Sequence, residues 1–165
     1  MIAVSNTTPL RYLLVIHQQA LLQELFEKVL IPHAVFEELT APNTPSIIRA
    51  IISSRPGWMT IRNVNETSAP TPGSLHRGEW EAIRLAAIVR PDFLLLDERA
   101  GRKEALRQNL PVIGTLGVLE RGDELGRIRD FPKVLAELKD SGFFLSASLE
   151  ELLLSRHMKR RSRSN

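Results

Sequence analysis

Short apolar runs alternate with helical patterns along most of this chain. The runs typical of buried strands are IAVS (2–5), VLI (29–31), DFLLLD (92–97) and PVIG (111–114). Apolar residues recur near i, i+3, i+4 and i+7 over 9–16, 20–27, 32–39, 46–54, 77–90 and 98–108, which predicts amphipathic helices. Continuous apolar strands separated by helices are typical of a parallel sheet covered on both faces. The pattern therefore predicts the α/β class.

The remaining segments predict an edge strand, one long loop and two closing helices. WMTIRNV (58–64) has the pattern of a further strand at the sheet edge, and 63–74 has the Ser, Thr, Asn, Pro and Gly content of a loop. DFPKVLAELKDSGF and SLEELLLSRHMK are amphipathic and predict the last two helices. Pro9, Pro32 and Pro132 suit the first turns of their helices, where a missing N–H costs nothing.

The composition indicates one globular domain. A chain of 165 residues, 43% of them apolar, can bury one core and is short for two. It has no cysteine, which excludes disulfides and thiolate metal sites and favours an intracellular protein. No apolar stretch approaches the roughly 20 residues that span a bilayer, and the start lacks a charged leader. We therefore expect a soluble, cytoplasmic protein that does not enter the membrane.

The positive charge is concentrated at the end of the chain. Residues 155–165 hold five of the 22 Lys and Arg and no acid, which leaves 17 basic against 19 acidic residues elsewhere. We predict a single domain over 1–154, slightly acidic, followed by a disordered basic tail over 155–165. Such a tail is either a solvated end or an electrostatic arm for phosphate backbones.

Oxygen-bearing side chains fall where the predicted strands and helices meet. They are Asn6, which closes the first strand, Glu38, Glu79, which opens a helix, and Asp97 and Glu98, which close the DFLLLD strand. Ligands of open parallel sheets bind at the carboxyl ends of the strands. Carboxylates without His or Cys suit Mg²⁺ or Mn²⁺, and such an ion supports phosphodiester hydrolysis. The alternative is structural: Glu79 complements a helix dipole and Glu98 pairs with Arg102.

Five motifs, in this order and spacing, resemble the PIN-domain nucleases, and within them a small VapC-like branch of toxins and predicted nucleic-acid-binding proteins. The motifs are SNTTPL (5–10), VLIPHAVFEEL (29–39), LHRGEWEAIRLA (75–86), LLLDERAGRKEA (94–105) and LPVIGTLGVL (110–119). The resemblance extends from about Ile2 to the SLEELL helix. It implies a three-layer α/β/α domain with a mainly parallel sheet of about five strands, and a metal-dependent ribonuclease.

The resemblance also implies a set of site residues. Its catalytic positions fall on Asn6, Glu38, Glu79 and Asp97, which would hold Mg²⁺ or Mn²⁺ together with Glu98. Asp97 is favoured over Glu98 as the ligand, and Glu37 replaces Glu38 if the register slips. Glu81 points about 200° away from Glu79 around an ideal helix, so it should not share the site.

Asn6 departs from the family pattern, in which aspartate is usual. Asparagine keeps one oxygen that can ligate a cation but lacks the negative charge and the second oxygen. Weaker metal binding is therefore expected, although the branch tolerates asparagine here.

Substrate contacts are expected around the acids. Thr7 and Thr8 would orient a water or contact a phosphate, or else cap the helix that follows. Because acids repel RNA, a basic rim is expected from Arg99, Arg102 and Lys103, with Arg77 and the tail as further candidates, although ordinary helix charges fit these positions too. Thr115 opens a helix whose N–H groups suit a phosphate, a feature that capping explains as well.

Three functions follow from these residues. The first is a metal-dependent endoribonuclease that cleaves RNA, as the toxin of a toxin–antitoxin pair with a cognate antitoxin and a possible homodimer. The second is a catalytically weak RNA-binding module, disabled by Asn6. The third is a scaffold whose groove binds a partner peptide. The sequence has no GxxxxGK[ST] loop and no G-x-S-x-G, which argues against an NTPase or a serine hydrolase.

Overall fold

The computed structural model describes residues 1–64 and 71–163. Within them lie five strands, β1 (Ile2–Ser5), β2 (Lys28–Pro32), β3 (Met59–Arg62), β4 (Phe93–Leu95) and β5 (Val112–Ile113). The same residues form nine helices: α1 (Thr7–Val15), α2 (Gln19–Leu25), α3 (His33–Thr40), α4 (Ser46–Ser53), α5 (Arg77–Val89), α6 (Arg99–Arg107), α7 (Thr115–Glu124), α8 (Phe131–Asp140) and α9 (Ala147–Arg163). The predicted loop over 63–74 includes 65–70, which lie outside the described residues.

The sheet is parallel throughout, with the strand order β3-β2-β1-β4-β5. From β1 the chain builds outward through β2 to β3, and then returns to place β4 on the other side of β1. The boundary between β1 and β4 is therefore the switch point of the sheet, where ligands of such folds bind. Ser5 is in register with Leu95, and the backbone N–H of Asn6 donates to the Leu95 carbonyl at 3.1 Å.

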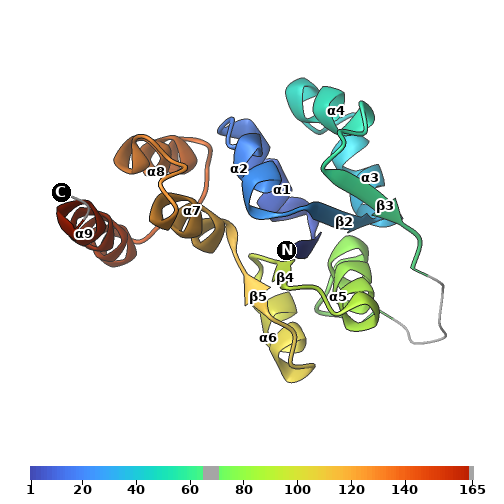
Figure 1. Ribbon diagram of the computed structural model, residues 1–165. Coiled ribbons are helices and arrows are strands. Elements are labelled where there is room, and N and C mark those ends of the chain that lie inside the picture. The colour runs from blue at the N-terminus through green and yellow to red at the C-terminus, as the bar shows by residue number, and fades with distance from the viewer. Residues whose placement is uncertain (65–70, 164–165) are drawn as a thin grey trace.

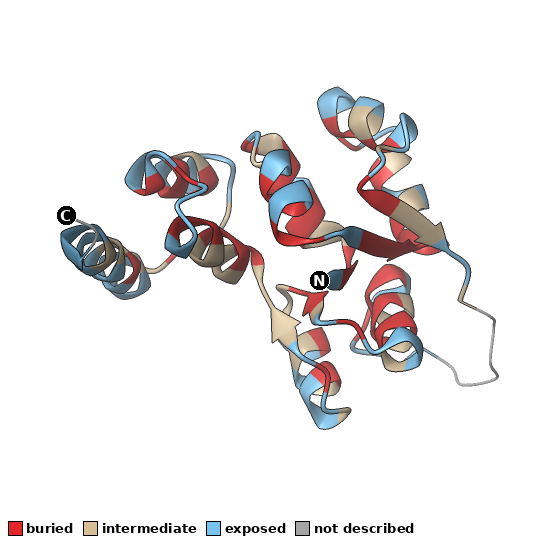
Figure 2. Cartoon of the chain, viewed as in Figure 1, coloured by how far each residue is buried: buried red, intermediate tan, exposed pale blue. Residues whose placement is uncertain are grey.

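Helices cover both faces of the sheet and make the predicted three layers (Figure 1). Alternate residues of the central strands enter two separate cores, because successive side chains of a strand point to opposite faces. Ala3 and Leu95 lie in the core shared with α1–α4, α7 and α8, whereas Val4 and Leu94 lie in the core shared with α5 and α6. The buried residues follow these faces in Figure 2. The α/β class and the edge position of β3 are confirmed.

The described part of the predicted disordered tail, residues 155–163, is helical. Residues 155–163 continue α9, which packs beside α7 and α8 and has one buried residue, Leu153. The charges are paired: Arg160 lies 2.9 Å from Asp123 and 3.4 Å from Glu120. His157 Nδ1 lies 2.8 Å from the same Asp123 carboxylate, whose side chain is 1% exposed. The acidic face of α7 thus orders the segment that charge counting predicts to be free.

Two further sequence expectations concern the prolines and the membrane. Pro9 and Pro132 lie in first turns as predicted, whereas Pro32 ends β2 and immediately precedes α3. Across residues 1–64 and 71–163, no helix has both the length and the apolar character needed to cross a bilayer.

Candidate metal and nucleic-acid site

A pocket of about 370 Å³ opens at the carboxyl ends of β1 and β4, at the switch point of the sheet. We call it the acid pocket. Its lining comes from four separated segments and consists of Asn6, Thr7, Thr8, Glu38, His76, Arg77, Glu79 and Glu98. The sheet order explains this meeting, since α1 leaves β1, α6 leaves β4, and α3 and α5 flank them. All of these residues except His76 are candidates named in the sequence analysis.

Glu79 is the buried acid of the pocket. It lies in the first turn of α5 with 3% of its surface exposed, and its Oε2 accepts from the backbone N–H of His76 at 3.3 Å. Its Oε1 is buried against Gly101 of α6 and has no hydrogen bond of ordinary distance and angle among the described residues, although the Gly101 backbone N–H opposes the rise in the pKa of Glu79. Burial raises the pKa of Glu79 above its ordinary value, and the nearby Glu98 carboxylate adds to this effect.

Asn6 joins the end of β1 to the acids. It is 4% exposed and is the N-cap of α1, where its Oδ1 accepts from the Thr7 backbone N–H. Its Nδ2 donates to Glu98 Oε2 at 3.0 Å. Both ends of the amide are therefore in use, and the amide orientation that satisfies the cap presents its NH₂ group to Glu98.

Thr7 and Thr8 hold the two more accessible carboxylates. Thr7 Oγ1 donates to Glu38, and Thr8 Oγ1 donates to Glu98. Neither threonine is the helix cap, because Asn6 occupies that position. The hydroxyl pair therefore positions the acids.

Two glycines allow the carboxylates to approach the helices closely. A Cβ at Gly101 of α6 would lie 2.8 Å from the Glu79 carboxyl carbon. A Cβ at Gly78 of α5 would lie 3.0 Å from the Glu38 carboxyl carbon. Both values are at or below the shortest contacts that a real Cβ makes, so any side chain at these positions would displace an acid.

Asp97 does not line the acid pocket. Its two carboxylate oxygens accept from the backbone N–H of Thr115 at 2.7 Å and from the Thr115 hydroxyl at 2.6 Å. Burial raises the pKa of Asp97, although these bonds from Thr115 oppose the effect. The preference for Asp97 over Glu98 in the sequence analysis therefore differs from the structure, which places Glu98 in the pocket and Asp97 at the start of α7.

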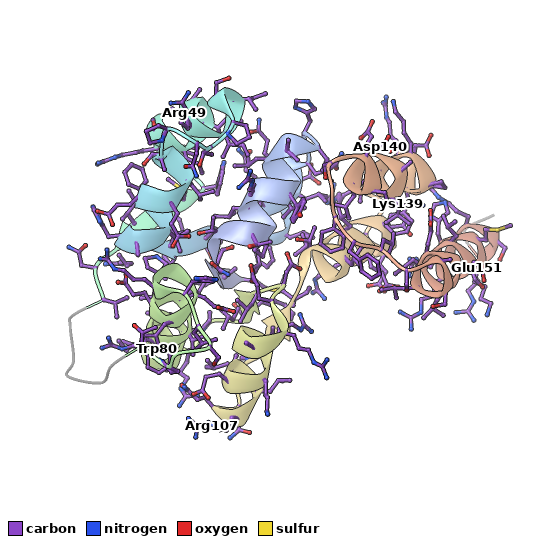
Figure 3. The ribbon with its side chains drawn as sticks, turned by 180° about the vertical axis from the view of Figure 1, so that it is seen from behind. Arg49, Trp80, Arg107, Lys139, Asp140 and Glu151 are labelled. Carbon is purple, nitrogen blue, oxygen red and sulfur yellow. The ribbon has the colours of Figure 1, made fainter. Side chains whose placement is uncertain are left out.

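The predicted basic rim is only partly assembled. Arg102 folds inward and donates to the Leu96 carbonyl at 2.9 Å, beside Asp97. Lys103 lies in a different pocket with Arg107, the residue at the tip of α6 in Figure 3. Arg99 is exposed and does not line the acid pocket. Thr115 is buried against Asp97, so it too lies outside the acid pocket.

Arg77, named as a further candidate in the sequence analysis, lies on the rim together with His76. Both line the acid pocket from the start of α5, and Arg77 also pairs with Glu81 at 2.9 Å and with Glu37 at 3.4 Å. Glu37 and Glu81 therefore face Arg77, outside the acid pocket, which leaves Glu38 as the α3 acid that lines it. The sequence signal for both rim residues is their place just before Glu79, at the N-terminus of a helix.

The donor chemistry of the acid pocket fits a hard divalent cation. Three carboxylates and an amide surround it, and one of the carboxylates is buried. As the side chains stand, the described part of the chain has no group of three Asp, Glu or His residues placed to hold one metal ion. In this arrangement Glu38 and Glu98 accept hydrogen bonds from Thr7 and Thr8.

Comparison with known proteins places the chain in a family. The sequence model of the PIN domain matches residues 2–159. The fold is similar to that of a PilT N-terminus domain protein from the hyperthermophilic archaeon Sulfolobus solfataricus P2, with a TM-score of 0.53, 15% identity, and coverage of 79% of this chain and 96% of that one. No curated protein matches the chain. The chain belongs to the PIN-domain family, a family with a nuclease fold.

Proposed function

We propose that this protein is a metal-dependent endoribonuclease that hydrolyses RNA phosphodiester bonds at the acid pocket. The observation that carries the proposal is the meeting of Glu38, Glu79 and Glu98, from three separate segments, in one pocket where Glu79 is buried beside a second carboxylate. A buried carboxylate is costly, and a cation compensates that cost. Membership of a family with a nuclease fold supports the same reading.

In this proposal Glu38, Glu79 and Glu98 hold Mg²⁺ or Mn²⁺, with Asn6 beside them. Such an ion supplies charge neutralisation for the phosphate and an activated water. Thr7 and Thr8 orient Glu38 and Glu98, the acids to which they donate. Arg77, on the rim, attracts the phosphate backbone toward a pocket that would otherwise repel it.

A cleavage assay with matched variants tests this proposal. Mixed RNAs are incubated with the pure protein and Mn²⁺, with and without EDTA, and beside Glu79→Gln and Glu81→Gln. Both variants remove one charge from α5, but only Glu79 lies in the acid pocket. We expect EDTA-sensitive cleavage that Glu79→Gln loses, by about 100-fold or more, and Glu81→Gln keeps. Equal cleavage by both variants would contradict the assigned site.

A second function, RNA or partner binding without strong catalysis, is favoured by one observation. The NH₂ group of Asn6 already bonds to Glu98, and no three acids are placed for an ion in the described residues. Under this reading RNA binds with the same affinity in EDTA and in Mn²⁺, and cleavage is absent in both. Measuring binding and cleavage on the same samples separates the two functions.

The role as a toxin and the cognate antitoxin rest on the sequence resemblance, and so does a homodimer. A toxin that cleaves RNA arrests growth when expressed alone, and co-expression with its antitoxin restores growth. Expression of the wild type and of Glu79→Gln in the same host tests this role, since only the wild type should be toxic. Sedimentation of the pure protein tests the dimer.

A further inference from the structure

A second pocket adjoins the acid pocket along α1. It has a volume of about 280 Å³, just below the usual range for small-molecule sites, and shares Thr8 with the acid pocket. We call it the α1 groove. Its lining consists of Thr8, Arg11, Tyr12 and Val15 from α1, Pro45 before α4 and Ser141 after α8.

The α1 groove follows one stripe of α1. Residues 8, 11, 12 and 15 have the i, i+3, i+4, i+7 spacing of a single helix face, whereas Leu10, Leu13 and Leu14 point into the core. At 1.5 Å per residue, the stripe from Thr8 to Val15 extends about 10 Å away from the acids. Ser141 of the lining directly follows Lys139 and Asp140, which end α8 and are labelled in Figure 3.

Two groups in the α1 groove match the chemistry of a nucleotide. Arg11 is exposed, makes no hydrogen bond or ion pair within the described residues, and is the one charged residue of the lining. Tyr12 is half-buried, and its ring packs edge-to-face against Phe143 with centroids 5.0 Å apart. Packing therefore fixes an aromatic ring that still lines the groove, next to an unpaired cation.

We propose that the α1 groove binds the nucleotides that flank the scissile phosphate of a single-stranded RNA. This inference rests on the proposed function, because it extends the bound RNA from the acid pocket, past the shared residue Thr8, into the α1 groove. Arg11 contacts a backbone phosphate and Tyr12 stacks on a base, a pairing typical of single-strand binding sites. Only an unstacked base can reach Tyr12, so the α1 groove selects single-stranded over double-stranded RNA.

Binding and cleavage are measured separately so that the two proposals can fail separately. Binding of a fluorescent ten-nucleotide RNA is followed in EDTA, where metal-dependent cleavage cannot occur, over a series of salt concentrations. The variants are Arg11→Gln, Tyr12→Leu and Tyr12→Phe. The matched control is Arg90→Asn, which removes an exposed arginine after α5 at a left-handed position that asparagine tolerates.

Tyr12→Leu should weaken binding about tenfold, because one stacked base is lost, and Tyr12→Phe should keep it. Arg11→Gln should weaken binding several-fold and reduce the salt slope by about one, whereas Arg90→Asn should change neither. A duplex of the same sequence should not respond to Tyr12→Leu. Thermal melts of all variants check the fold.

Unchanged single-strand affinity in folded Arg11→Gln and Tyr12→Leu would overturn the proposal, and would leave the α1 groove to a peptide partner. Cleavage by the wild type in Mn²⁺ would still support the nuclease in that case. Conversely, groove-dependent binding without any cleavage would support the α1 groove and contradict the proposed enzyme.

Discussion

The side-chain amide of Asn6 donates a hydrogen bond to Oε2 of Glu98 at 3.0 Å. A neutral donor therefore stands where the sequence resemblance implies a carboxylate, and it satisfies one of the acids rather than adding another. Charged acceptors make the stronger hydrogen bonds of proteins. Asn6 thus stabilises the folded acid pocket in the absence of any cation, which an aspartate at this position would not do.

Asn6→Asp should lower the folding stability of the metal-free protein and raise its affinity for a cation. In EDTA the variant places a second carboxylate against Glu98 and loses the amide bond, so the free energy of unfolding should fall by about 1–3 kcal/mol. In Mn²⁺ the added charge should raise affinity, and the Mn²⁺-dependent rise in Tm should exceed that of the wild type. Thermal melts across Mn²⁺ concentrations measure both effects. An equal rise in the two proteins would place residue 6 away from the cation.

Glu79→Gln should stabilise the protein at neutral pH. The folded-state pKa of Glu79 lies above its ordinary value of 4.5 because of burial, so its contribution to stability is present below pH 4.5 and is lost as pH rises through the folded pKa. Glutamine does not ionise, so the variant does not lose this stability as the pH rises. Its Tm should therefore exceed that of the wild type at pH 7 and converge with it near pH 4, as measured in EDTA. A constant difference across this range would contradict an ionised, buried Glu79.

Much of the architecture could be predicted from the chain because it depends on short-range pattern. Residues 3–5 of the run IAVS are buried at the centre of the sheet, and WMTIRNV lies at its edge, as their hydrophobic content indicates. The positions of Asn6 and Glu79 in the acid pocket follow in turn from the rule that strand ends and helix starts meet at a switch point.

The rest depends on contacts that no local pattern encodes. In the adjacent pair Asp97 and Glu98, Thr115 of a later helix binds Asp97. Glu98 is held instead by Asn6 and Thr8, at the end of the first strand. Likewise, the basic run after Leu154 looks free until α7 supplies Glu120 and Asp123 across a long sequence separation. From its charge composition alone this segment is expected to be solvated. Ion pairs with α7 instead hold it against the domain.

Asp97→Ala should destabilise the fold without removing cation binding. The change leaves the buried Thr115 N–H without its acceptor, so the free energy of unfolding should fall by about 2 kcal/mol. Asp97→Asn keeps an acceptor for that N–H and should cost less than about 1 kcal/mol. The stabilisation by Mn²⁺ should survive in Asp97→Asn and be lost in Glu98→Gln. The reverse pattern would make Asp97 the ligand, as the sequence resemblance implies.

Arg160→Ala should loosen α9 from α7. Asp123 is buried with a side chain only 1% exposed, so loss of the arginine at 2.9 Å leaves its charge to His157 alone. A cost of about 3 kcal/mol is expected for breaking a buried pair. Arg163→Ala, at the exposed end of the same helix, should change stability by less than about 0.5 kcal/mol. Urea unfolding measures both, and equal costs would contradict docking through Asp123.

Gly101→Ala should impair the acid pocket more than the fold. Alanine favours a helix over glycine by up to about 1 kcal/mol, which offsets part of the strain. The new Cβ would lie 2.8 Å from the carboxyl carbon of Glu79, which is buried and has little room to move. Mn²⁺ affinity should therefore fall about tenfold or more, an effect typical of displaced ligands. In EDTA the free energy of unfolding should fall by no more than about 2 kcal/mol, because the gain in helix propensity offsets part of an overpacking cost of about 1–3 kcal/mol.

Gly78→Ala provides a graded comparison for this prediction. Its Cβ would lie 3.0 Å from the carboxyl carbon of Glu38, but Glu38 is exposed and can rotate away. The loss of Mn²⁺ affinity should therefore be smaller than in Gly101→Ala. Gly73→Ala, with open space around its Cβ, should have no effect on Mn²⁺ binding. Calorimetric titration with Mn²⁺ ranks the affinities of the three variants. A larger loss in Gly78→Ala than in Gly101→Ala would contradict this ranking, because cation binding would then depend more on Glu38 than on the buried Glu79.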